Sequence, residues 1–173
     1  VAAGVGEGGL VKAGLRRAMG GESFFVGQYT SHMSGAWLAV APSFPGDIGI
    51  LEVGPNSPWT ITTGAFLAGE KTVSPDLAYG GFKLAMLHEG LTALRLNGRG
   101  TALVAAYGGL EKMIVREGQE IVIDTGHLVA WTTGMSLRLG TLGGVVTTNV
   151  IGEGLVGVFS GPGEIYVQTR AEG

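Results

Sequence analysis

The strongest constraint on the fold is a ten-residue block that occurs twice. Residues 121–130 read Ile-Val-Ile-Asp-Thr-Gly-His-Leu-Val-Ala, and residues 59–68 read Trp-Thr-Ile-Thr-Thr-Gly-Ala-Phe-Leu-Ala. In both blocks an alternating run ends in Thr-Gly. The next residue differs between the two blocks, and it is followed by two apolar residues and an alanine. Alternation with a period of two is typical of a strand with one face in the core. Glycine, which has no Cβ, then allows the backbone to bend. The pattern predicts a repeated β unit.

A second block, a glutamate and a small residue followed by an apolar run, occurs three times. Its glutamates are Glu22, Glu89 and Glu153, and a glycine followed by another apolar run comes 13, 11 and 10 positions later (35−22, 100−89 and 163−153). Two strands joined by a short glycine-containing turn predict a β-hairpin. The intervals between the glutamates (89−22=67 and 153−89=64) are close to the interval between the Thr-Gly glycines (126−64=62). The sequence therefore predicts a unit of roughly 65 residues.

Each predicted unit consists of a hairpin, a connecting strand and a Thr-Gly strand pair. The connecting strands are expected over residues 46–51 and 109–114. The third hairpin has no Thr-Gly block after it, so we expect a longer natural protein to carry the missing piece before Val1. The predicted organisation is a glycine-rich loop with a short basic amphipathic helix at 1–21, ending an incomplete N-terminal unit, full β units at 22–80 and 81–140, and a partial third unit at 141–173.

Charge and cysteine content narrow the classes of function. Only 14% of the residues are charged, against about 25% in an average soluble domain. We therefore expect part of the surface to be buried against other copies of the chain. The net charge of −3 argues against a generic binder of nucleic acid or anionic membranes. The absence of cysteine excludes disulfides and thiolate metal sites.

The candidate interaction site is a basic amphipathic patch near the N-terminus. Its apolar members fall on one face of a short helix and its basic members lie mostly elsewhere. Such a helix is suited to contact either a membrane surface or a protein partner. The alternative is a purely structural role, in which the loop helix packs on its own chain or on a neighbouring subunit. The patch comprises Leu10, Lys12, Leu15, Arg16, Arg17 and Met19.

Nothing in the sequence forms a recognisable catalytic or metal site. The three histidines, His32, His88 and His127, fall in different units, and no H-x-H or H-x-x-E motif occurs. A metal site needs two or three ligands that converge from neighbouring strands. Asp124 and His127 lie close together in sequence, and we interpret Asp124 as a residue that caps the bend. We predict no catalytic residues, no cofactor and no metal.

With these blocks in place, the chain resembles the altered-inheritance-of-mitochondria 24 family over nearly its whole length. The resemblance implies a fold like that of the tryptophan RNA-binding attenuation protein, with several short jelly-roll-like units per chain and a symmetric oligomer. It implies no established enzyme activity and no catalytic residues. The matching segments include Gly20–Phe25, Pro45–Ile48, Thr63–Ala68, Gly98–Gly100, Val122–Ala130, Gly152–Leu155, Gly161–Gly163 and Gln168–Arg170.

The sequence therefore predicts an all-β protein of repeated short jelly-roll-like β-sandwich units, a shortened double-stranded β-helix. We expect a homo-oligomer, with three copies as the favoured number because three units per chain suit a pseudo-symmetric ring. The expected role is that of a non-enzymatic structural or interaction protein in the cytoplasm of a bacterium or archaeon, with a membrane surface or a protein as further contact. A metal- or small-molecule-dependent cupin-like enzyme is the alternative. An RNA-binding ring is disfavoured because Arg95 and Arg99 do not recur with the unit.

Overall fold

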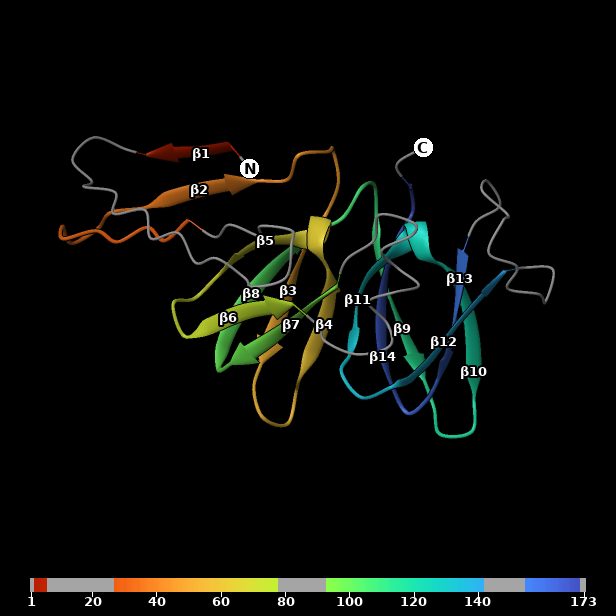
Figure 1. The fold of residues 1–173 in the computed structure, drawn as a ribbon. Coiled ribbons are helices and arrows are strands. Elements are labelled where there is room, and N and C mark those ends of the chain that lie inside the picture. The colour runs from red at the N-terminus through yellow and green to blue at the C-terminus, as the bar shows by residue number, and fades with distance from the viewer. Residues whose placement is uncertain (1, 6–26, 78–92, 142–154, 172–173) are drawn as a thin grey trace. The chain divides into compact units, whose positions relative to one another are not determined.

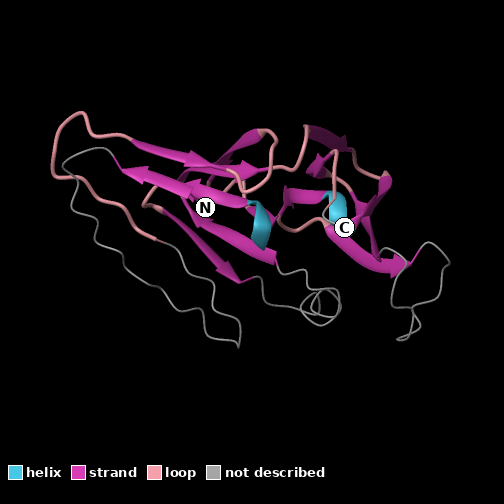
Figure 2. Cartoon of the chain, turned by 90° about the horizontal axis from the view of Figure 1, so that it is seen from above, coloured by secondary structure: helices cyan, strands magenta, loops and turns pink. Residues whose placement is uncertain are grey.

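Strands form nearly all the regular structure of the described residues, so the predicted all-β class is confirmed (Figure 1, Figure 2). The computed structural model describes residues 2–5, 27–77, 93–141 and 155–171. They fall into two compact units, 1–43 and 44–173. In the first unit, β1 (Ala2–Val5) pairs antiparallel with β2 (Leu38–Ala41).

The described part of the second unit contains three sheets. Their strand orders are β3-β8-β5, β6-β7-β4-β11-β14-β9 and β10-β13-β12, and every pairing within them is antiparallel. The strands are β3 (Ile48–Val53), β4 (Trp59–Thr62), β5 (Phe66–Gly69), β6 (Val73–Leu77), β7 (Ala93–Gly98), β8 (Gly100–Ala105), β9 (Leu110–Val115), β10 (Glu120–Asp124), β11 (Leu128–Thr132), β12 (Ser136–Thr141), β13 (Leu155–Ser160) and β14 (Gly163–Gln168).

Strands that follow one another in sequence mostly belong to different sheets. β7 lies in the six-stranded sheet and β8 in β3-β8-β5, and β13 and β14 are separated in the same way. The hairpins predicted after Glu89 and Glu153 are therefore wrong. At the first of these corners, Gly98 and Gly100 have φ values of 101° and 144°, which glycine adopts far more readily than other residues. The chain thus passes from one layer to the other and does not fold back on itself.

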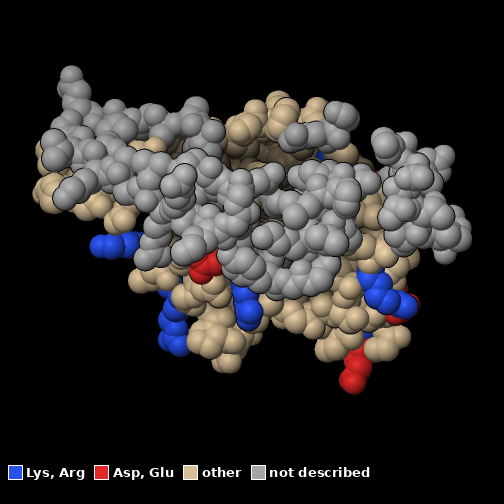
Figure 3. Space-filling view, viewed as in Figure 1, with Lys and Arg blue, Asp and Glu red and all other residues tan. Residues whose placement is uncertain are grey.

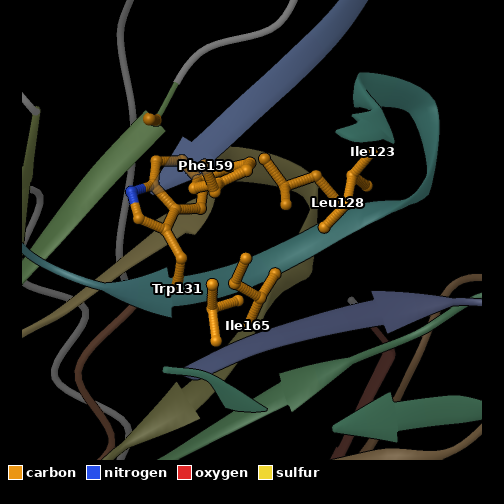
Figure 4. Close-up of a cluster of buried hydrophobic side chains, with 7 residues drawn as sticks. Ile123, Leu128, Trp131, Phe159 and Ile165 are labelled. Atoms are coloured by element: carbon orange, nitrogen blue, oxygen red, sulfur yellow. The ribbon is translucent and has the colours of Figure 1, made fainter. Parts of the chain in front are cut away.

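The core of the second half lies between β10-β13-β12 and the β11-β14-β9 part of the large sheet. Trp131 and Phe159 meet edge to face, with ring centroids 5.8 Å apart, and Ile165 lies beside them (Figure 4). Ile123 and Leu128 extend the same cluster on either side of a bend. These side chains come from four different strands, so the cluster holds the two layers together.

The two halves of the second unit meet along one pair of strands, β4 and β11, which we call the seam. Trp59, Thr60 and Ile61 lie opposite Thr132, Trp131 and Ala130. All three β4 residues are buried, although the alternating sequence predicted one buried face. In β10 the expected alternation holds, with Ile123 buried and Val122 exposed. β4 lies inside a sheet, between β7 and β11, whereas β10 lies at the edge of a sheet of the described residues.

Truncation of the central core ring should be strongly destabilising. We expect Phe159→Ala to lower the free energy of unfolding by about 3–5 kcal/mol, because it removes a fully buried ring and leaves a cavity. Urea unfolding followed by tryptophan fluorescence would measure the change. The control, Ile114→Ala on an exposed side chain, should change it by less than about 0.5 kcal/mol. Similar losses in both variants would contradict this description of the core.

Candidate functional site

The two Thr-Gly bends are single turns of 3-10 helix that carry the chain from one sheet to another. They are η1 (Thr63–Ala65), between β4 and β5, and η2 (Thr125–His127), between β10 and β11. At η2, Asp124 Oδ1 accepts a hydrogen bond of 2.9 Å from the Gly126 backbone N–H. The prediction that Asp124 caps this bend is confirmed. At η1 the equivalent residue, Thr62, makes no such cap.

His127 and Gln168 tie η2 to the end of β14. Nδ1 of the half-buried His127 lies 2.7 Å from the Gln168 carbonyl oxygen. The Gln168 side chain donates from Nε2 to the Gly126 carbonyl at 3.0 Å and accepts the Tyr107 N–H at 2.9 Å. One glutamine thus joins the bend, the last strand and the connector between the halves. Gln168 lies 42 positions from Gly126 and 61 positions from Tyr107 in the sequence, so no local sequence pattern predicted these bonds.

The connector 106–110 is held by backbone and side-chain hydrogen bonds. Asp47 Oδ2 accepts the Leu110 N–H at 3.0 Å, and Thr169 Oγ1 accepts the Gly109 N–H at 2.8 Å. The Tyr107 ring contacts Phe44, with ring centroids 5.1 Å apart, and the Arg170 guanidinium, 5.6 Å from its centroid. These polar groups satisfy backbone donors, so the cluster serves the fold.

Charged side chains are few and scattered on the face shown in Figure 3. Among the described residues, two ion pairs lie on the surface, Lys112 with Glu164 at 2.8 Å and Arg138 with Glu120 at 2.6 Å. The hydrogen bond that Lys112 donates to Glu164 raises the pKa of Lys112, which stays charged throughout the neutral range. Exposed pairs of this kind contribute little to stability.

A different kind of surface feature lies at β10. Val122, in the middle of this edge strand, is 56% exposed, although its neighbours Ile121 and Ile123 are half-buried and buried. Edge strands carry unpaired backbone groups that can pair with another chain. Sequence alternation identified the outward face of β10 but not its position at an edge. This strand, and not the bend beside it, is the candidate interaction site.

The basic patch predicted from the sequence lies outside the described residues. Its members are Leu10, Lys12, Leu15, Arg16, Arg17 and Met19, and the contact predicted for them stays a prediction. His88 also lies outside the described residues, and His32 is exposed.

The described residues bring no three His, Cys, Asp or Glu side chains into an arrangement that could hold a metal ion. Within the same residues, no helix has the length and apolar character needed to cross a membrane.

Comparison with known proteins identifies the family. The model for Mitochondrial biogenesis AIM24 matches residues 1–170. The chain belongs to this family. The uncharacterised protein M6_Spy0233 of Streptococcus pyogenes is 34% identical over 168 residues, which is 96% of this chain and 66% of that protein. The crystal structure of SPYM3_0169 from Streptococcus pyogenes shares 30% identity with a TM-score of 0.62, covering 76% of this chain and 57% of that one. The chain therefore spans about two thirds or less of the length of these relatives.

The role of Gln168 in the AIM24 chain can be tested by truncation. Gln168→Ala should lower the free energy of unfolding by about 1–3 kcal/mol, because it leaves the Tyr107 N–H and the Gly126 carbonyl without their side-chain partner. The control is Gln119→Ala, which removes one exposed bond to the Arg116 N–H and should cost less than about 1 kcal/mol. Chemical denaturation of both variants gives the comparison. Equal losses would show that Gln168 does not join these segments.

Proposed function

We propose that the chain is a non-enzymatic structural or interaction protein that works as a homo-oligomeric β assembly. In this proposal copies of one jelly-roll-like unit lie side by side, first within a chain and then between chains, and three chains form the assembly. The basic patch at 10–19 provides a second contact, to a membrane surface or a protein partner. The seam between β4 and β11 is the observation that carries the proposal.

The strand pairings support a repeated unit. In residues 48–105, β8 pairs with β3 and β5, and β7 pairs with β4 and β6. In residues 110–168, β14 pairs with β9 and β11, and β13 pairs with β10 and β12. Each strand of the second half occupies the place of its counterpart in the first. The shared order is what two copies of one unit would produce.

An irregularity in the pairing supports the same conclusion. The register shifts between Phe66 and Ala68 in β5, and again between Leu128 and Ala130 in β11. The interval between the two shifts (128−66=62 and 130−68=62) equals the interval between the Thr-Gly glycines (126−64=62). Bulges are specific features of a strand. A bulge at the equivalent place in both halves favours duplication over chance resemblance.

The seam supports lateral assembly of such units. It joins the two halves by sheet hydrogen bonding and buries Trp59, Thr60 and Trp131. Thr60 Oγ1 lies 2.8 Å from Thr133 Oγ1 across the seam, and the Trp59 ring contacts Tyr166 at a centroid distance of 5.6 Å. Burial of apolar side chains stabilises such a contact by about 25 cal/mol per Å² of apolar surface removed from water. A unit that binds one neighbour through the edge of a sheet can use another sheet edge to bind a second neighbour in the same way.

The low charge content is in keeping with assembly. Charged residues, which make up 14% of the chain, are depleted in the cores of protein interfaces. A chain with few charges therefore has more surface suited to burial against copies of itself.

Native mass spectrometry of the protein, with metal analysis of the same sample, tests the proposal. We expect a species of three chains without stoichiometric metal, because sheet edges drive association in this account. Dilution should shift the distribution towards smaller species. A monomer at micromolar concentration would contradict the assembly, and a stoichiometric metal would favour the cupin-like enzyme instead.

A further inference from the structure

Two edge strands of the larger unit are the counterparts of the strands that form the seam. β10 occupies in the second half the place that β4 occupies in the first, and β5 corresponds in the same way to β11. β4 and β11 are joined, whereas β10 and β5 each lie at the edge of a three-stranded sheet of the described residues. The chain therefore has, at the edges of its described sheets, one counterpart of each seam strand: β10 for β4 and β5 for β11.

Three of the four other edge strands in the described sheets of this unit differ from these two; the fourth, β3, carries Glu52 on the same exposed face as Ile50. β6 contains Pro75, which lacks a backbone N–H, and β9 and β12 carry Lys112 and Arg138. Proline and charged side chains are the usual protection of an edge against pairing. β10 has neither in its centre, since Ile121, Val122 and Ile123 are all apolar. β5 carries no charge along its length.

The exposed fractions of equivalent side chains also differ between the seam strand β4 and the edge strand β10. Thr60, in the seam, is 6% exposed, whereas its counterpart Val122 is 56% exposed. The exposed position thus carries an apolar valine, whereas the equivalent buried position in the seam carries a less apolar threonine. Pairing of β10 with another strand would satisfy the outward backbone groups and bring a neighbouring strand beside Val122.

We propose that β10 of one copy pairs antiparallel with β5 of a second copy, in the register of the seam. In the seam Ile61 lies opposite Ala130 and Thr60 opposite Trp131. Replacing each of these residues by its counterpart in the other half places Ile123 opposite Ala68 and Val122 opposite Gly69. The inference rests on the proposed function, and it specifies which surfaces of two copies meet.

The contact is head to tail. It uses β10 of one copy and β5 of the next, so each copy has a second edge left to bind another. Contacts of this type close into a ring or extend as a filament. Gly69 presents no side chain to obstruct Val122. A Cβ at Gly69 would meet Phe66 and Val73 at 3.6 Å, an ordinary contact distance, so the position tolerates a cysteine.

Disulfide trapping tests this register, because the chain contains no cysteine. Gly69→Cys and Val122→Cys are made as separate full-length proteins, mixed and oxidised, so that a mixed dimer reports only contact between copies. We expect at least about tenfold more mixed dimer than in the control mixture, because opposed thiols react at a raised effective concentration. The control pairs Gly69→Cys with Ser136→Cys, an exposed residue on the other edge strand of the same sheet.

A charge substitution gives the second readout. Val122→Lys should lower the fraction of assembled protein at least about tenfold in native mass spectra, since a lysine in the centre of an edge strand opposes pairing with another strand. Ile114→Lys, at a 69% exposed position on β9, should assemble as the wild type does. Circular dichroism of both variants confirms that they fold.

The outcomes separate this inference from the proposed function. A wild-type assembly without preferential trapping, or one that Val122→Lys leaves intact, would overturn the β10–β5 contact and leave the assembly standing. A monomeric wild type would overturn both. Preferential trapping of the Gly69→Cys and Val122→Cys mixture, together with loss of assembly in Val122→Lys but not in Ile114→Lys, would establish the contact.

Discussion

The continuation of one sheet across β4 and β11 is the interaction on which the larger unit depends. Without it, the six-stranded sheet would end at β4 in residues 48–105 and at β11 in residues 110–168, and each half would have a further sheet edge. The seam buries Trp59, Thr60 and Ile61 on both faces of β4. Strands of similar sequence differ in burial here: β4, inside a sheet, is buried on both faces, whereas β10, at an edge, alternates between buried and exposed residues. Sheet edges are the part of a β protein most prone to pairing, and the fold uses one such pairing internally.

The sequence predicted the kind of structure better than its connections. Alternation located β4 and β10, the register of the repeated blocks located β3 and β9, and the Thr-Gly blocks located η1 and η2. The hairpins after Glu89 and Glu153 were wrong, because short spacing between two strands does not say whether they pair or cross to another layer. That choice depends on glycine conformations such as Gly98 and Gly100. β6 was missed because Pro75 and Asp76 interrupt its apolar pattern.

The candidate site could be predicted only in part, for a related reason. Alternation shows that Val122 faces away from Ile123, but it does not identify the strand's neighbours. Only the order of strands in the sheets places β10 at an edge. The Asp124 cap is local, with donor and acceptor two residues apart, and was correctly predicted. The bonds of Gln168 join segments distant in sequence, so no single-sequence pattern could reveal them.

Hydrogen exchange of backbone amides over a series of protein concentrations tests the central claim most directly. The amides of β4 and β11 should exchange slowly at every concentration, because their partners belong to the same chain. In β10, the amides that point away from β13, which alternate along an antiparallel strand, should exchange fast in dilute protein and slow as concentration rises. The contrary result is a β10 whose outward amides exchange fast at concentrations where the assembly is complete, or a β4 that exchanges as fast as β10.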